Sequence, residues 1–161
     1  MTTKKLGTLL THAGSNPKKY DGIVNMPVHR ASTIVFNTYE DYENIEKAPY
    51  SYGRYGTPSS VAFEQAIAEL EGAAGSVSAC SGLSAIVIAI MSFARAGDHV
   101  LITDNIYSSS RKFCSEMLAK YGVDIEYYPP MIGAGIGSLF RKNTKVLFIE
   151  APGSLSFEVC D

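Results

Sequence analysis

The feature that most constrains the fold is an alternation of helical and strand-like apolar patterns, which begins near residue 58 of this 161-residue chain. Apolar residues three and four positions apart predict an amphipathic helix that starts at Pro58 and is ended by Gly72. Predicted strands follow at 76–80, 99–103, 123–128 and 146–149, and predicted helices lie between them at 84–95, 113–121 and 136–140. Such alternation implies right-handed crossovers and a mostly parallel sheet, so the predicted fold class is α/β with helices flanking the sheet.

The two ends of the chain lack this alternation. Residues 1–58 scatter Gly, Pro, Asn and Tyr between short apolar pieces, and we predict an irregular N-terminal arm there, followed by a sheet-containing domain at 59–161. The sequence stops at Phe157–Asp161, directly after a predicted strand and turn and without a closing helix. We therefore expect part of a sheet, with an exposed edge strand.

Composition and charge exclude several classes of protein. The net charge is −2 and the lysines form no polybasic tract, so neither nucleic acid nor a membrane surface is an expected partner. The longest apolar stretch, Ala85–Ala94, is too short to span a bilayer, and the start has no apolar secretion signal, which predicts a cytoplasmic protein. The three cysteines form no C-x-x-C and the three histidines lack ligand spacing, so we predict reduced thiols and no metal site.

Three turns follow predicted strands, where ligands of open parallel sheets gather. Ser81-Gly82-Leu83-Ser84 would present backbone amides at a helix N-terminus, which suits a phosphate dianion, although a simple capped helix has the same pattern. Tyr107 would place an aromatic ring on the same rim for a planar ligand, or would pack locally at the start of a helix. Glu150–Ser154 offers a carboxylate and a hydroxyl, and equally fits an ordinary turn.

A separate loop, Pro49–Pro58, carries three tyrosines and Arg54 between Gly and Pro residues. An arginine fork matches phosphate oxygens, and a partner subunit would bury the tyrosine rings; a locally folded surface loop is the alternative. Nucleotide-binding glycine motifs and the G-x-S-x-G elbow of α/β-hydrolases do not occur in the sequence. Nucleotide binding and that hydrolase class are therefore disfavoured.

Several segments together resemble the Cys/Met-metabolism (trans-sulfuration) branch of the fold-type I pyridoxal-phosphate enzymes, and most of all the cystathionine β-lyases. The matching segments, in order, are Thr11–Gly14, Pro27–Phe36, Tyr52–Thr57, Leu70–Gly72, Ser81–Gly82, Gly97–Leu101, Tyr107 and Glu150–Ser154. The resemblance implies part of the large domain of that fold and a pyridoxal 5′-phosphate cofactor. Gly153-Ser154 is more like the β-lyases, whereas γ-lyases and γ-synthases tend to have Thr-Asn there.

The resemblance also implies roles for individual residues. Gly82 and Leu83 would offer amides to the cofactor phosphate, and Tyr107 would stack on its ring. Tyr52 and Arg54 would reach the phosphate of a neighbouring subunit, which implies a homo-oligomer, a dimer or a tetramer. The implied reaction of the complete enzyme, which belongs to methionine biosynthesis, cleaves cystathionine to homocysteine, pyruvate and ammonia.

That chemistry needs a Schiff-base lysine, and none of the nine lysines lies in a turn just past a predicted strand. In the family, both this lysine and the acid at the pyridine nitrogen lie downstream of the segment that Phe157–Asp161 resembles. We therefore expect no catalytic residue and no covalent cofactor in this chain. Two readings remain: the first part of a lyase or of a γ-synthase or γ-lyase relative, and a non-catalytic phosphate-binding or dimerisation module. A small enzyme with another chemistry is disfavoured.

Overall fold

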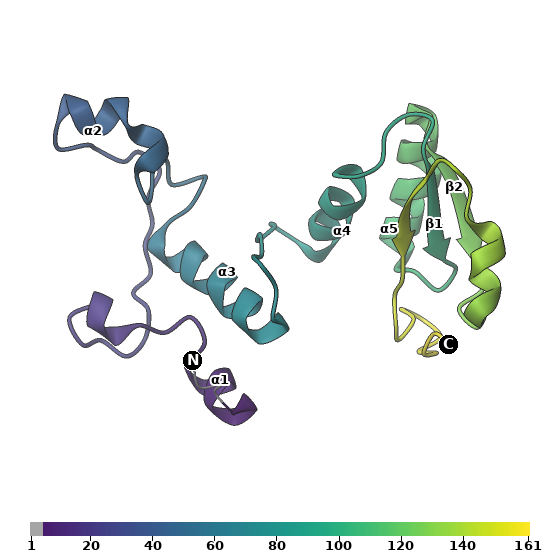
Figure 1. Ribbon diagram of the computed structural model, residues 1–161, viewed down its shortest axis with the longest axis horizontal. Coiled ribbons are helices and arrows are strands. Elements are labelled where there is room, and N and C mark those ends of the chain that lie inside the picture. Colours follow the sequence, from purple (N-terminus) through teal and green to yellow (C-terminus); the bar gives the residue numbers. More distant parts are fainter. Residues whose placement is uncertain (1–4) are drawn as a thin grey trace. The chain divides into compact units, whose positions relative to one another are not determined.

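The computed structural model describes residues 5–161, which form two compact units, one up to Ser78 and one from Ala79 onward. The first unit contains α1 (Leu6–His12), η1 (Pro17–Lys19), α2 (Tyr39–Glu43), η2 (Ile45–Lys47) and α3 (Pro58–Glu71) (Figure 1). The second contains α4 (Gly82–Met91), β1 (His99–Thr103), α5 (Ser108–Lys112), η3 (Phe113–Leu118), η4 (Ala119–Tyr121), β2 (Asp124–Tyr128), η5 (Gly133–Leu139) and β3 (Thr144–Phe148).

Helix α3 is the longest single helix of the described residues, and local sequence sets both of its ends. Thr57 and Ser60 form a capping box and Pro58 occupies the first turn, where a missing N–H costs nothing. Gly72 ends the helix with φ of 62°, a left-handed conformation that glycine adopts without strain. The helix predicted from Pro58 to Gly72 is therefore confirmed.

The rest of the first unit is mostly irregular, as predicted for the arm, and is tied together at a few points. Gly14 approaches α3 so closely that a Cβ at position 14 would lie 2.6 Å from the Ala62 carbonyl oxygen. A single bridge joins Thr33 to Tyr52. Thr57 is the one described residue of this unit that counts as buried, so the unit has no apolar core of its own. The division of the chain at residue 58 stays a prediction.

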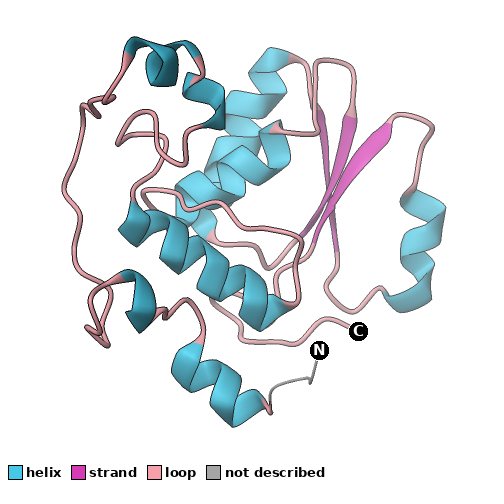
Figure 2. Ribbon diagram, turned by 60° about the vertical axis from the view of Figure 1, so that its left-hand side comes forward, coloured by secondary structure: helices cyan, strands magenta, loops and turns pink. Residues whose placement is uncertain are grey.

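The second unit is built on a three-stranded parallel sheet with the order β2-β1-β3. The crossovers from β1 to β2 and from β2 to β3 run in opposite directions across the sheet, and right-handed crossovers then place their helices on opposite faces. Figure 2 shows this arrangement, with η5 on one side of the sheet and the helical residues 108–121 on the other. The α/β fold with a parallel sheet and flanking helices is thus present.

Strand β1 is the centre of the core. All five of its residues are buried, because strands on both sides and helices on both faces cover it. Ile90 of α4 and Cys114 and Leu118 of the segment after α5 pack with Val100 and Ile102. β2 and β3 are the two edges of the sheet among the described residues, and the side chains of β3 are alternately half-buried and exposed.

Six predicted elements need correction or adjustment. The strands predicted at 123–128 and 146–149 are β2, Asp124–Tyr128, and β3, Thr144–Phe148. The predicted strand at 76–80 is wrong: this segment has no regular structure, and the Ser78 N–H donates to the Glu64 carboxylate at 2.8 Å instead of to a neighbouring strand. The helix predicted at 84–95 runs from Gly82 to Met91. The helix predicted at 113–121 begins earlier, at Ser108, and the one predicted at 136–140 is the 3-10 helix η5. Within residues 5–161, no helix has the length and apolar character needed to cross a bilayer.

Candidate functional site

The start of α4 presents backbone amides, as the turn at Ser81-Gly82 predicts. Ser81 is the N-cap, and its hydroxyl accepts the Ser84 N–H at 3.1 Å, while the Ala85 N–H bonds the Ser81 carbonyl at 3.0 Å. The amides of Gly82 and Leu83 precede these bonds, and neither has an acceptor among residues 5–161. A Cβ at Gly82 would meet nothing within 4 Å, so the approach to these amides is open. Two donors with the helix dipole behind them can hold an anion.

Tyr107 lies at the N-cap of α5, after the carboxyl end of β1. Its side chain is 44% exposed, so a face of the ring is available to a ligand. Its carbonyl accepts the Arg111 N–H at 3.0 Å, and its own N–H donates to Glu150 Oε2 at 3.2 Å. The backbone of Tyr107 is therefore fixed from both sides while the ring remains accessible.

The turn after β3 contacts the turn after β1, since the two strands are neighbours. Glu150 binds the Ser154 hydroxyl through its second carboxylate oxygen, and the Ser154 N–H donates to the Asn105 carbonyl at 3.1 Å. Gly153 is buried against Asn105, whose Oδ1 accepts the Thr103 hydroxyl at 2.7 Å. The sequence pointed to the carboxylate of Glu150 without giving it a role and did not point to Asn105, because their contacts depend on which strands are adjacent.

Burial also shapes the chemistry at this edge of the sheet. Burial and the neighbouring Cys160 raise the pKa of the Tyr128 hydroxyl, and a hydrogen bond with Thr103 only partly opposes this. The protonated hydroxyl donates to the Phe148 carbonyl at 3.0 Å. The Cys160 thiol in turn contacts the Glu150 carbonyl at 3.3 Å. These contacts hold the ends of β2 and β3 and the following turn in one network.

Tyr52 and Arg54 lie in the first unit, on the loop that follows η2. Tyr52 is 39% exposed and its ring contacts that of Tyr55 edge-on, with centroids 5.5 Å apart. Arg54 has no hydrogen-bond or ion-pair partner among the described residues and lines a cavity of about 390 Å³ together with Arg30 and Ser78. Both side chains are available to a further binding partner.

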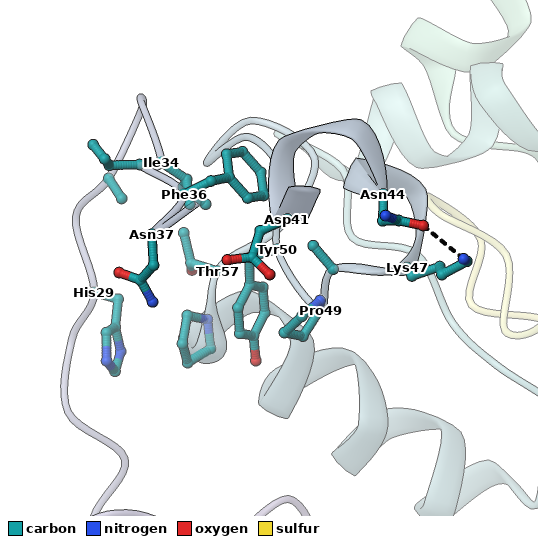
Figure 3. A pocket seen from close by; sticks show the side chains of 14 residues that line it. His29, Ile34, Phe36, Asn37, Asp41, Asn44, Lys47, Pro49, Tyr50 and Thr57 are labelled. Atoms are coloured by element: carbon teal, nitrogen blue, oxygen red, sulfur yellow. Dashed lines mark hydrogen bonds between the residues drawn. The ribbon is translucent and has the colours of Figure 1, made fainter. Parts of the chain in front are cut away.

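A larger cavity of the first unit, about 550 Å³, lies between the segment 29–37, α2 and the start of α3 (Figure 3). Its charged groups are engaged with neighbours: Asp41 accepts the Thr38 N–H at 3.2 Å, and Lys47 donates to Asn44 at 2.7 Å. None of the predicted site residues lines it. This cavity therefore offers no chemistry that would make it the candidate site.

Comparison with known proteins now decides the family. Residues 7–161 match the family described as Cys/Met metabolism PLP-dependent enzymes. The chain belongs to this family. The cystathionine beta-lyases of Escherichia coli and Salmonella typhimurium are each 41% identical to it over 165 aligned positions, which cover the whole of this chain and 42% of either relative. The crystal structure of metB from Corynebacterium glutamicum aligns with a TM-score of 0.89 at 27% identity, over 99% of this chain and 40% of that one.

The chain thus spans about two fifths of the length of these relatives. Members of the family depend on pyridoxal phosphate. Lys142 precedes β3 and Lys145 is its second residue, so both lie at the amino edge of the sheet. Lys112 and Lys120 lie in the helical segment 108–121. No described lysine of the second unit follows a strand at the carboxyl edge.

Proposed function

We propose that this chain is the cofactor-phosphate and ring-stacking portion of a pyridoxal-phosphate-dependent carbon–sulfur lyase of the cystathionine β-lyase type. The observation that carries the proposal is the pair of unpaired amides at Gly82 and Leu83 in the same unit as the exposed ring of Tyr107. The names of the relatives give the substrate class: cystathionine would be cleaved to homocysteine, pyruvate and ammonia by the complete enzyme.

The residues fit the cofactor. The open approach to Gly82 leaves room for a phosphate, and the helix dipole of α4 favours its negative charge. The exposed face of Tyr107 suits a planar pyridine ring, for which stacking contributes on the order of 1 kcal/mol beyond burial. When bound, pyridoxal phosphate supplies an electron sink for the pair released at the substrate α-carbon.

Tyr52 and Arg54 are proposed to serve a second copy of the chain. The guanidinium of Arg54 has no acceptor among the described residues, and its fork geometry matches phosphate oxygens. The first unit also exposes large apolar side chains, including Tyr55 at 85%, that a partner subunit would cover. A homo-oligomer follows from the two arguments together.

The lysine that would move the α-proton is assigned to the part of the relatives that this chain does not match. We therefore expect the chain alone to bind the cofactor without forming a covalent bond to it and without lyase activity. A non-catalytic phosphate-binding or dimerisation module is the second candidate, and the unpaired amides are compatible with it. The γ-synthase or γ-lyase alternative is disfavoured by Gly153-Ser154.

The phosphate site is tested by removing one amide without disturbing the helix. Gly82→Pro deletes a donor at the first helical position, where proline is well tolerated, and Ser81 already has the extended backbone that precedes proline. Gly82→Ala keeps the amide and meets no neighbour. In calorimetric titration with pyridoxamine phosphate, Gly82→Pro should bind about tenfold more weakly, as expected for one charge-assisted hydrogen bond, and Gly82→Ala like the wild type. Equal affinities for the two variants would contradict the site.

The lyase is tested with a chimera in which this chain replaces the matching first 42% of the Escherichia coli enzyme. Pyruvate formed from cystathionine would support a β-lyase, whereas 2-oxobutyrate would indicate a γ-lyase. A folded chimera that binds pyridoxal phosphate and forms neither product would favour the non-catalytic module. Borohydride reduction of the isolated chain with pyridoxal phosphate should label no specific lysine.

A further inference from the structure

We infer that Glu150 is a positioning residue that fixes the backbone of Tyr107 and so the start of the helical segment after β1. Glu150 is the second residue after the end of β3 at Phe148, and its carboxylate contacts the turn after β1. The relation of Glu150 to the cofactor rests on the proposed function; its relation to Tyr107 does not.

A hydrogen bond joins the Tyr107 N–H to the Glu150 carboxylate. The Tyr107 N–H lies before the first turn of α5 and has no partner inside the helix, so it depends on an acceptor from elsewhere. Glu150 Oε2 accepts it at 3.2 Å. A carboxylate at the N-terminal end of a helical segment is also favoured by the helix dipole, which here extends through the continuous helical residues 108–121.

The Glu150 carboxylate is itself held in place by the turn that follows it. Its other oxygen accepts the Ser154 hydroxyl, and the Ser154 N–H donates to the Asn105 carbonyl at 3.1 Å. Glu150, Ser154 and Asn105 thus connect the two turns in a closed set of contacts, which we call the Glu150 clamp. The tight contact of Gly153 with Asn105 leaves the clamp little freedom to shift.

These contacts restrict the backbone that carries the Tyr107 ring. Tyr107 has its N–H fixed by Glu150 and its carbonyl fixed by Arg111, while its side chain stays 44% exposed. An exposed ring on a fixed backbone is pre-organised for stacking, since less freedom is lost on binding. Loss of the Glu150 carboxylate should therefore loosen Tyr107 first and weaken binding of a planar ligand as a result.

The test uses the full chain and two readouts. Amide hydrogen exchange reports the opening of the Tyr107 N–H without any ligand, and titration with pyridoxamine phosphate reports binding. Glu150→Ala should speed exchange at Tyr107 about tenfold, as loss of one hydrogen bond to a charged acceptor predicts, and weaken binding severalfold. Glu150→Gln keeps an acceptor oxygen and should restore exchange to within about threefold of the wild-type rate.

Glu158→Ala is the matched control, because it removes the same charge from the same turn while the Glu158 carbonyl still accepts the Gly153 N–H at 2.8 Å. It should leave exchange at Tyr107 unchanged. Equal exchange in Glu150→Ala and wild type would overturn the inference, as would faster exchange that Glu150→Gln fails to reverse. Failure of the wild-type chain to bind pyridoxamine phosphate would overturn the proposed function instead, and exchange at Tyr107 would still decide the role of Glu150.

Discussion

The side chain of Asn105 lies directly against the Cα of Gly153, so that a Cβ at position 153 would lie 2.5 Å from Asn105 Nδ2 and 2.8 Å from Asn105 Cβ. These two residues follow β1 and β3, which are neighbours in the sheet. Nδ2 of Asn105 is buried and has no hydrogen-bond partner among the described residues. Asn105 and Gly153 therefore pack by van der Waals contact, which leaves no room for a side chain at position 153.

We expect Gly153→Thr to lower the free energy of unfolding by roughly 1–3 kcal/mol, because the new side chain overpacks against Asn105. Urea denaturation followed by circular dichroism measures this change. In Asn105→Gly, which has no side chain at the contact, the same substitution at 153 should cost less. A double-mutant cycle with no coupling between the two positions would contradict the contact.

Ser81 allows the stability of α4 to be separated from anion binding. Ser81→Ala removes the cap acceptor of the Ser84 N–H and should cost about 1 kcal/mol. Ser81→Asp keeps an acceptor, so it should preserve stability, but its charge should repel a phosphate and weaken binding of pyridoxamine phosphate. Thermal melts and calorimetric titration of both variants measure the two effects. Unchanged phosphate affinity in Ser81→Asp would argue against a phosphate at this turn.

His99 joins three strands at the amino edge of the sheet. The side chain is fully buried in β1, and Nδ1 forms a 2.8 Å hydrogen bond with Thr144 Oγ1 of β3. Nε2 lies 3.2 Å from Glu126 Oε2 of β2 without forming a hydrogen bond. Glu126 is also paired with Arg141. His99→Ala should lower the free energy of unfolding by roughly 2–4 kcal/mol, since it leaves a buried cavity and removes the hydrogen bond with Thr144. Lys145→Ala, at an exposed position of β3, is the control and should change it by no more than about 0.5 kcal/mol.

Burial of the Cys114 thiol should make the free energy of unfolding depend on pH. Burial raises the pKa of the thiol from its ordinary value of 9.0 to about 11 in the folded chain. Between these pH values the unfolded chain loses the thiol proton and the folded chain keeps it. Stability from this group is thus fully present below pH 9 and is lost as the pH rises toward 11, by roughly 2–3 kcal/mol in all.

The measurement is urea unfolding between pH 8 and pH 10.5 for the wild type and Cys114→Ala. Other groups that titrate in this range contribute equally to both proteins, so the difference in slope isolates Cys114. The wild type should lose stability more steeply. Parallel pH profiles would show that the Cys114 thiol ionises alike in the folded and unfolded chains.

Most helices and strands of the second unit were predictable because each has its own local pattern of apolar residues. Strand β1 has the predicted bounds, since the apolar residues Val100–Ile102 lie in a run of strand length that aspartates bound on both sides. The start of α5 was missed because Ser108, Ser109 and Ser110 carry no apolar pattern. The prediction of a strand at 76–80 was wrong because strand pairing is not a local property. No described strand pairs with this segment, and the Ser78 N–H donates to the Glu64 carboxylate instead.

The same distinction applies to the candidate site. The turns at Tyr107 and Glu150 were found from sequence because each follows a strand, and the turn at Gly82 was found from its serines and glycine although the strand predicted before it is absent. The roles of the five predicted site residues stay predictions. The contact of Glu150 with the Tyr107 amide could not be foreseen, because it requires β3 to lie beside β1 rather than beside β2. Strand order is set by the whole sheet and not by any one segment.

The strand order β2-β1-β3 also has a consequence for synthesis on the ribosome. β1 is made first of the three strands, yet both of its partners follow it: Asp124 pairs with His99, and Thr144 pairs with the same residue from still further along the chain. Until β3 emerges, the fully buried central strand has an unsatisfied edge. A nascent chain that ends before β3 therefore leaves one edge of β1 open to pairing with a second copy.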